Sequence, residues 1–158
     1  MSKSLKRVIA ALNAAGLTAD VIELEQARTA AEAAEGAGCH LDQIVKSIVF
    51  RGADSDLPVL FLTAGGNRVS ARKATALAGE PLGKADAAFI RRTTGFAIGG
   101  VAPLGHLTPV RTWFDPALLS FDQVFGAAGT PRHVFAIAPD ALIRTTGAVH
   151  GDFTEDPS

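Results

Sequence analysis

The stretch Phe96-Ala97-Ile98-Gly99-Gly100-Val101-Ala102-Pro103-Leu104-Gly105-His106 decides how the rest of the chain is interpreted. A short apolar run enters two consecutive glycines and leaves through a proline, which predicts a buried strand that turns into a rigid loop. Glycine allows a ligand to approach the main chain, and Pro103 fixes φ and has no N–H. We therefore expect the loop to offer backbone groups to a carboxylate, a phosphate or a developing oxyanion. A plain turn is the alternative.

A second informative stretch is Ile44-Val45-Lys46-Ser47-Ile48-Val49-Phe50, which predicts a strand with a lysine in its middle. Alternation places Lys46 on one face with Ile44, Ile48 and Phe50, and both faces are otherwise apolar except at the centre. A lysine there favours either an edge strand whose ammonium reaches water or a cationic anchor at the mouth of a pocket.

With these two stretches, the chain resembles the YbaK and prolyl-tRNA-synthetase-associated (insertion-domain-like) family of freestanding aminoacyl-tRNA deacylases. The resemblance covers nearly the whole chain. It runs from Val8 through the lysine strand, the block from Thr93 to Gly105, and Gly129-Thr130-Pro131-Arg132. It implies an α+β single domain, residues 1–158, with a mixed, strongly curved, barrel-like β-sheet flanked by helices. It also implies hydrolysis of mischarged tRNA in trans.

The resemblance further implies which residues act. Lys46 would hold the aminoacyl or terminal-adenosine end, and the Gly100 backbone would stabilise the ester carbonyl or orient the terminal ribose hydroxyl. Water assisted by that hydroxyl, or the thiol of a cysteine substrate, would attack. The residues expected to bind the substrate are Gly99, Val101, Ala102, Pro103, Thr63, Gly129, Thr130 and His133. In this family the helix that Thr29 opens borders the active site, so that Arg28 and Thr29 would approach the end of the tRNA, but the residues alone favour a helix-capping role for Thr29.

The expected substrate is tRNA(Pro) carrying a small amino acid such as alanine or 2-aminobutyrate. His133 favours this interpretation, because a histidine at the corresponding place in synthetase-embedded relatives helps to recognise the amino acid. The alternatives are a cysteinyl-tRNA(Pro) deacylase, a non-catalytic module that binds tRNA or prolyl-tRNA synthetase, and a small-molecule amino-ester hydrolase. A pure binding module has no physical need for a lysine inside an apolar strand.

Composition limits the remaining possibilities. The 158 residues are 47% hydrophobic and 20% charged, which predicts a globular protein, and the net charge of -1 provides no overall positive field for nucleic acid. Any tRNA contact would need a local patch, for which Arg68, Arg72 and Lys73 are the candidates, with Arg91 and Arg92 as further possibilities. A solvated helix face is the alternative. No basic repeat or aromatic motif indicates DNA binding or sequence-reading RNA binding.

Other chemistries lack a pattern in the sequence. The four histidines and Cys39 show no metal-ligand spacing, so no metal or cofactor is expected, and no Ser-His-Asp or Cys-His arrangement is readable. A single cysteine excludes an internal disulfide and suits a reducing compartment, and no apolar run approaches the length of a membrane span. We therefore expect a cytoplasmic protein without a membrane partner.

Hydrophobic periodicity and capping residues predict helices at residues 4–15, 29–34, 70–78, 86–94 and 139–144, and Ser70 is the expected cap of the third. A short helical turn is expected to start at Asp115-Pro116, with Asp115 as its cap. They predict strands at 21–24, 44–50, 57–63, 96–98, 110–114, 124–129 and 133–138. The polar tail from residue 151 is expected to be frayed.

Overall fold

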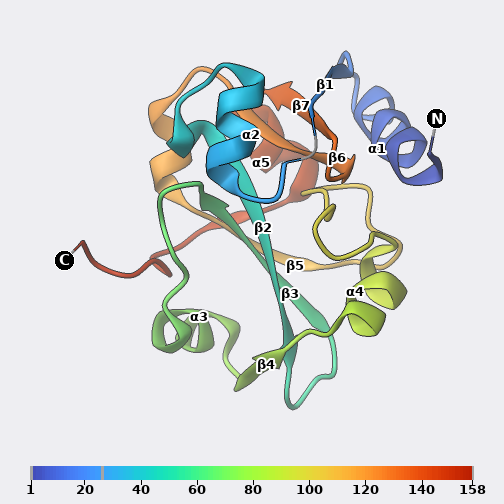
Figure 1. Ribbon diagram of the computed structural model, residues 1–158. Helices are drawn as coiled ribbons and strands as arrows, with labels where there is room; N and C mark the ends of the chain where they lie inside the picture. The colour runs from blue at the N-terminus through green and yellow to red at the C-terminus, as the bar shows by residue number, and fades with distance from the viewer. Residues whose placement is uncertain (1, 26, 158) are drawn as a thin grey trace.

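The computed structural model describes residues 2–25 and 27–157. Within these residues, eight strands form one mixed sheet in the order β1-β7-β6-β2-β3-β5-β8, and β4 pairs with β2 (Figure 1). The strands are β1 (Asp20–Glu23), β2 (Ile44–Gly52), β3 (Pro58–Ala64), β4 (Leu82–Lys84), β5 (Arg111–Phe114), β6 (Val124–Thr130), β7 (His133–Ile137) and β8 (Val149–His150). The helices are α1 (Lys3–Ala14), α2 (Ala30–Ala37), α3 (Ala71–Ala78), α4 (Ala87–Thr94) and α5 (Pro139–Thr146), with 3₁₀ turns η1 (Leu41–Gln43) and η2 (Pro116–Ser120). The expected α+β architecture with a mixed sheet flanked by helices is confirmed.

The lysine strand β2 is the centre of the sheet. It pairs antiparallel with β3 over residues 45–51, and the polar turn at residues 52–56 closes this hairpin. Its other edge pairs with two strands at its two ends: β6 runs parallel to Ile44 and Val45, and β4 runs antiparallel to residues 50–52. Among the described residues, no strand therefore lies beside the middle of that edge.

Helices cover both faces of the sheet, and each side has its own apolar cluster. Leu5, Val8 and Leu12 of α1 pack beside Val45 of β2 in the largest cluster, which also takes in the apolar faces of α4 and α5. On the other face, α2 packs over Ile44, and α3 packs beside Ile48 and Phe50. Figure 1 shows α2 over the start of β2 and α3 at a distance from it, so the middle of β2 passes between the two helices. The alternation expected for β2 is confirmed by this separation.

Two expectations about local structure are wrong. Residues 96–98 form no strand, because the chain turns at once: Gly99 has φ +90°, the Gly100 amide donates to the Ala97 carbonyl at 3.0 Å, and Ile98 is 61% exposed. The tail is not frayed either, because Phe153 is fully buried against α3 and its carbonyl accepts from the Ser70 amide at 2.7 Å. The tail was expected to be frayed because its composition is polar, but its single buried apolar residue, Phe153, holds it in place.

Candidate active site

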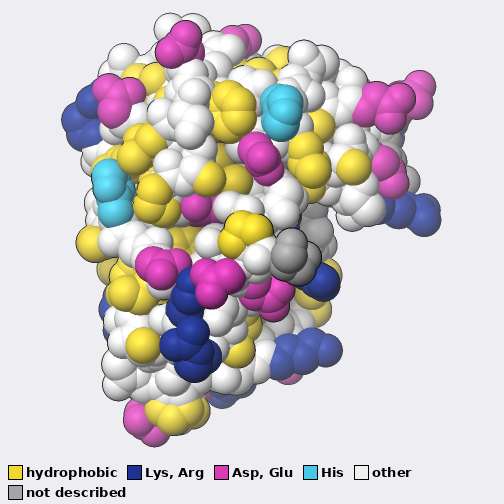
Figure 2. All heavy atoms as spheres, turned by 90° about the vertical axis from the view of Figure 1, so that its left-hand side faces the viewer, with side chains coloured by type: hydrophobic (Ala, Val, Ile, Leu, Met, Phe, Trp, Pro, Cys, Tyr) yellow, Lys and Arg dark blue, Asp and Glu magenta, His cyan; other side chains and the backbone are white. Residues whose placement is uncertain are grey.

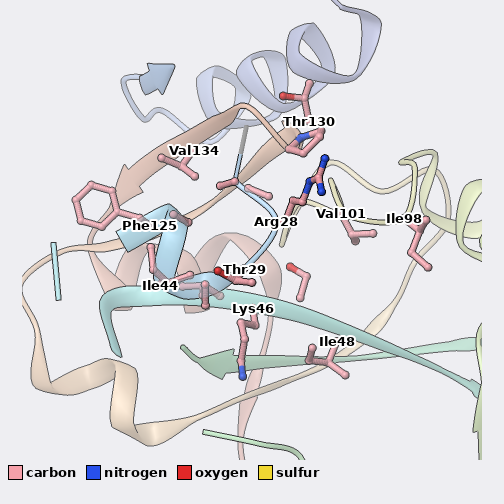
Figure 3. A pocket seen from close by; sticks show the side chains of 18 of the residues that line it. Arg28, Thr29, Ile44, Lys46, Ile48, Ile98, Val101, Phe125, Thr130 and Val134 are labelled. Atoms are coloured by element: carbon pink, nitrogen blue, oxygen red, sulfur yellow. The ribbon is translucent and has the colours of Figure 1, made fainter. Parts of the chain in front are cut away.

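The main pocket lies where the edge of β2 is open. It has a volume of about 460 Å³ and is bounded by β2, α2, the β6–β7 hairpin, and the loop that follows α4 (Figure 3). Its wall is mostly apolar, with Ile44, Phe125 and Val134 on one side and Ile98 and Val101 on the other. Of the site residues expected from sequence, Lys46, Gly99, Val101 and Thr130 line it. Such a cavity suits a small apolar group held by a few polar contacts.

Lys46 borders the pocket, but its ammonium is held outside it, on another side of β2. Lys46 Nζ donates to the carbonyl oxygen of Asn67, and in the view of Figure 3 its side chain leaves β2 on the side opposite Val101 and Arg28. There it lines a second cavity of about 440 Å³ together with Arg68 and Glu155. Lys46 therefore stands between the two cavities.

Burial and neighbouring charges shift the pKa of the Lys46 ammonium. Burial lowers the pKa of the Lys46 ammonium, the nearby Arg68 lowers it further, and Asp115 and Asp42 partly oppose the shift. Asp115 is 3% exposed and accepts hydrogen bonds from the Ala64 amide at 3.0 Å and from the Asn67 side chain at 2.9 Å. It thereby fixes the turn whose carbonyl receives Lys46.

The glycine loop is held close to the β6–β7 turn. A Cβ added at Gly100 would lie 3.0 Å from Thr130 Cα and 3.1 Å from the Gly129 carbonyl oxygen, so only glycine fits there without movement. The Gly100 amide, expected to stabilise the ester carbonyl, already donates to Ala97 at 3.0 Å. The Gly100 N–H therefore already has a partner, and Gly100 itself does not line the pocket.

Arg7 of α1 fastens both ends of this loop. Its Nη2 donates to the Gly95 carbonyl at 2.7 Å, its Nε donates to the Gly105 carbonyl at 3.0 Å, and its guanidinium carbon lies 4.5 Å from the centre of the Phe96 ring. His106 adds a third attachment, since its Nε2 lies 2.8 Å from the Ala102 carbonyl oxygen. Burial lowers the pKa of His106, so the neutral ring donates this hydrogen bond.

Several polar residues at the mouth of the pocket support one another. Thr29 accepts from the Glu32 amide at 3.1 Å, so it caps α2 and lines the pocket at the same time. Figure 3 shows the Arg28 side chain extending from this region toward Thr130. The Thr130 hydroxyl lies 2.7 Å from His133 Nδ1. His133 does not line the pocket itself, and its contact with the pocket is through Thr130.

The other residues expected at the site lie behind its wall. Thr63 is fully buried and donates to the Phe61 carbonyl at 3.0 Å, and Ala102 is fully buried in the core. Pro103 packs on Gly126, where an added Cβ would meet its ring at 3.0 Å. Gly129 has φ +93° and lies against the Ser4 carbonyl, so it shapes the turn before Thr130. These four residues support the pocket without lining it.

The expected basic patch is only partly available. Lys73 forms ion pairs with Asp152 at 3.1 Å and Asp156 at 2.9 Å, so its ammonium is committed to the tail. Arg68 lines the cavity that contains the Lys46 ammonium, and Arg72 is exposed. On the face shown in Figure 2, dark blue basic side chains lie beside magenta acidic ones, so no area of one sign dominates it.

Comparison with known proteins identifies the family. The aminoacyl-tRNA editing domain matches residues 24–145. The chain belongs to this family. The uncharacterized protein YwhH of Bacillus subtilis (strain 168) is 32% identical over 124 residues, which are 78% of each chain. A crystal structure of a candidate trans-editing enzyme for prolyl tRNA synthetase is 44% identical with a TM-score of 0.92, and the match covers 99% of both chains. A scaffold protein used for computational epitope grafting is 42% identical, also with a TM-score of 0.92, over 99% of this chain and 100% of the scaffold.

Family membership supports aminoacyl-tRNA editing, that is, a deacylase activity in general. Sequence reasoning missed Arg7 and Asp115, which hold the loop and the turn around the pocket. Arg7 sits in an ordinary amphipathic helix, and Asp115 was interpreted only as the cap of a helical turn. Neither carries a local signal, because each acts on a segment more than 40 residues away. Among the residues that the structure describes, no helix is long and apolar enough to cross a membrane.

Proposed function

We propose that the chain is a trans-editing hydrolase that removes a small amino acid, such as alanine or 2-aminobutyrate, from mischarged tRNA(Pro). The observation that carries this proposal is the apolar pocket, bordered by Lys46 and a glycine loop, in an aminoacyl-tRNA editing domain. The solved relative described for prolyl tRNA synthetase supports the choice of tRNA. The expected place of action is the cytoplasm, where charged tRNA is used.

The pocket favours positioning over side-chain nucleophiles. Its lining contains no cysteine and no histidine among the described residues, and burial raises the pKa of the Cys39 thiol, which lies outside it. An ester is an activated substrate, so orientation and electrostatic stabilisation of the oxyanion can supply large rate factors. We propose that Lys46 anchors the terminal nucleotide, that the Gly100 carbonyl orients the ribose hydroxyl, and that water attacks.

The size of the pocket limits its selectivity. One methylene is worth only about 1–3 kcal/mol in an apolar site, so the pocket can reject proline yet discriminate weakly among alanine, 2-aminobutyrate, serine and cysteine. A preference for cysteine would favour the cysteinyl-tRNA(Pro) alternative. Prolyl-tRNA synthetase is a proposed second partner, and adding it to the assay tests whether docking increases the rate.

The deciding experiment is deacylation of tRNA(Pro) charged with alanine, 2-aminobutyrate, cysteine, serine or proline. Wild type is compared with Lys46→Ala and with Lys84→Ala, a control that removes an exposed lysine outside the pocket. Release of one or more small amino acids by wild type and K84A, with proline retained and K46A inactive, is the expected result. If wild type leaves every ester intact while still binding tRNA, the hydrolase proposal is wrong.

A further inference from the structure

The edge of β2 is open where it passes the main pocket. On this edge β6 pairs only with Ile44 and Val45, and β4 pairs with residues 50–52. Residues 46–49 lie between these neighbours, and all four line the pocket. An open strand edge presents the N–H and C=O groups of alternate residues to whatever lies beside it.

The pairing of β3 shows which residues of β2 point their backbone groups into this opening. The Leu62 carbonyl accepts from the Asp115 amide at 2.9 Å, and the Ala64 amide donates to Asp115 Oδ2 at 3.0 Å, so both residues direct their backbone groups toward β5. Ser47 lies opposite Leu62 and therefore belongs to a pair that exchanges no hydrogen bonds. The N–H and C=O of Ser47 consequently point away from β3, toward the open edge.

Ser47 thus directs two main-chain polar groups toward the pocket, and its side chain adds a third polar group that has no partner in the part of the chain that the structure describes. Across the described residues, neither β6 nor β4 reaches its N–H or C=O, and its side-chain oxygen is buried without a hydrogen-bond partner. A buried polar group without a partner costs about 1–3 kcal/mol. An arrangement of this kind is suited to a ligand that supplies the missing donor and acceptor.

We propose that the main chain of Ser47 binds the aminoacyl group of the substrate as a one-residue β-bridge. An α-aminoacyl ester carries an amino N–H and a carbonyl oxygen on either side of one Cα, as a residue of a strand does. The Ser47 carbonyl accepts from the amino group, and the Ser47 N–H donates to the ester carbonyl. No Asp or Glu lines the pocket among the described residues, so main-chain carbonyls are the acceptors available to the amino group.

This inference rests on the proposed function and assigns the group that stabilises the oxyanion. The oxygen of a water molecule bonds to the ester carbonyl carbon, and the π electrons of the C=O bond move to the carbonyl oxygen. The Ser47 N–H stabilises this charge in place of the Gly100 N–H, which is bonded to Ala97. The C=O bond then re-forms, the bond to the ribose oxygen breaks, and that oxygen takes the proton released by the water.

The first test removes one N–H and nothing else. Ser47 is replaced by its α-hydroxy acid analogue, so that an ester oxygen stands where the amide N–H was, and hydrolysis of alanyl-tRNA(Pro) is followed. We expect kcat to fall about 10²-fold, as for the loss of one oxyanion donor, with an unchanged Tm because this N–H has no partner in the sheet. The matched control is the same replacement at Phe50, which lies opposite Val59 and faces β3. It should lower Tm and leave kcat unchanged.

The second test changes the substrate. Propionyl-tRNA(Pro) lacks the amino group, so its rate enhancement over uncatalysed hydrolysis should be about tenfold smaller than that of the alanyl ester. The bridge is refuted if the Ser47 replacement keeps kcat within about twofold of wild type, or if both esters are accelerated equally.

A binding measurement separates this inference from the proposed function. Amide hydrogen exchange at Ser47 is measured with and without 3′-alanylamino-3′-deoxyadenosine, which cannot be hydrolysed as an ester. Slower exchange at Ser47 supports the bridge even if wild type hydrolyses no ester, in which case only the proposed function fails. Unchanged exchange at a saturating concentration of this compound overturns the bridge, whatever the hydrolysis assay shows.

Discussion

Replacing Arg7 by alanine should loosen the glycine loop and lower both stability and activity. Arg7 is half-buried and makes two hydrogen bonds, to the Gly95 and Gly105 carbonyls, and one cation–π contact with Phe96. Hydrogen bonds from a charged group are worth about 1.5 kcal/mol each at the lower end of their range, and an exposed cation–π contact about 0.5–1 kcal/mol. The free energy of unfolding should therefore fall by about 3.5–4 kcal/mol, which corresponds to roughly 10 °C in Tm.

The activity of the Arg7→Ala variant should fall because the loop carries Ile98, Gly99 and Val101 into the pocket. Misplacement of a binding group by about 1 Å can cost up to about 10²-fold in rate, so we expect kcat/KM for alanyl-tRNA(Pro) to fall between tenfold and 10²-fold. Thermal melts and single-turnover deacylation measure the two effects. Arg7→Lys keeps the charge but cannot reach both carbonyls, so it should lie between alanine and wild type.

The matched control is Lys6→Ala, which removes an exposed cation from the same helix. It should change neither the free energy of unfolding nor kcat/KM. If R7A loses less than about 1 kcal/mol and retains kcat/KM, the two carbonyl contacts do not fasten the loop and the reasoning fails.

Three further outcomes are expected. Gly100→Ala should keep its fold by circular dichroism but lose at least about tenfold in kcat/KM, because the new Cβ would lie 3.0 Å from backbone atoms of the β6–β7 turn; wild-type kinetics would show that the close packing is unimportant. Burial and Arg68 lower the pKa of Lys46, so activity that needs its ammonium should decline at a lower pH than it would with an ordinary lysine. Arg68→Ala should move this alkaline decline in the pH–activity profile to higher pH. An unchanged profile argues against repulsion between Arg68 and Lys46. Burial lowers the pKa of His106, Arg7 lowers it further, and the Ala102 hydrogen bond opposes the shift. Near pH 6.5 the histidine is therefore protonated in the unfolded chain but stays neutral in the folded protein. The free energy of unfolding from urea titrations should therefore fall as pH drops below about 6.5, and His106→Gln should reduce that slope, whereas an identical slope would point to other groups.

The sequence predicts most of the architecture because its elements carry local signals. Apolar alternation marks β2, Ser70 caps α3 as expected, and the helices end at glycines in the left-handed conformation. The short strands β4 and β8 were missed, since three and two residues carry no periodicity. Residues 96–98 were misassigned because an apolar run does not distinguish a strand from a loop in which Phe96 is buried beneath Arg7 and Ile98 is exposed.

Part of the site was predicted because some of its residues also carry a local signal in the sequence. Lys46 and the glycine loop stand out as unusual residues in their surroundings, and both border the pocket. The direction of the Lys46 ammonium, the occupied Gly100 amide and the open edge at Ser47 depend on which segments lie next to one another. Such information is absent from any single stretch of chain.

The opening in the sheet beside β2 has a consequence for mutational surveys of this protein. Main-chain groups survive almost every substitution, so a scan that exchanges side chains at residues 46–49 would record tolerance at Ser47 even if that residue were indispensable. Among residues small enough for this half-buried position, only proline, which removes the N–H, would stand apart. A position that accepts small side chains but not proline would therefore indicate a functional backbone, where an ordinary survey would register an unimportant residue.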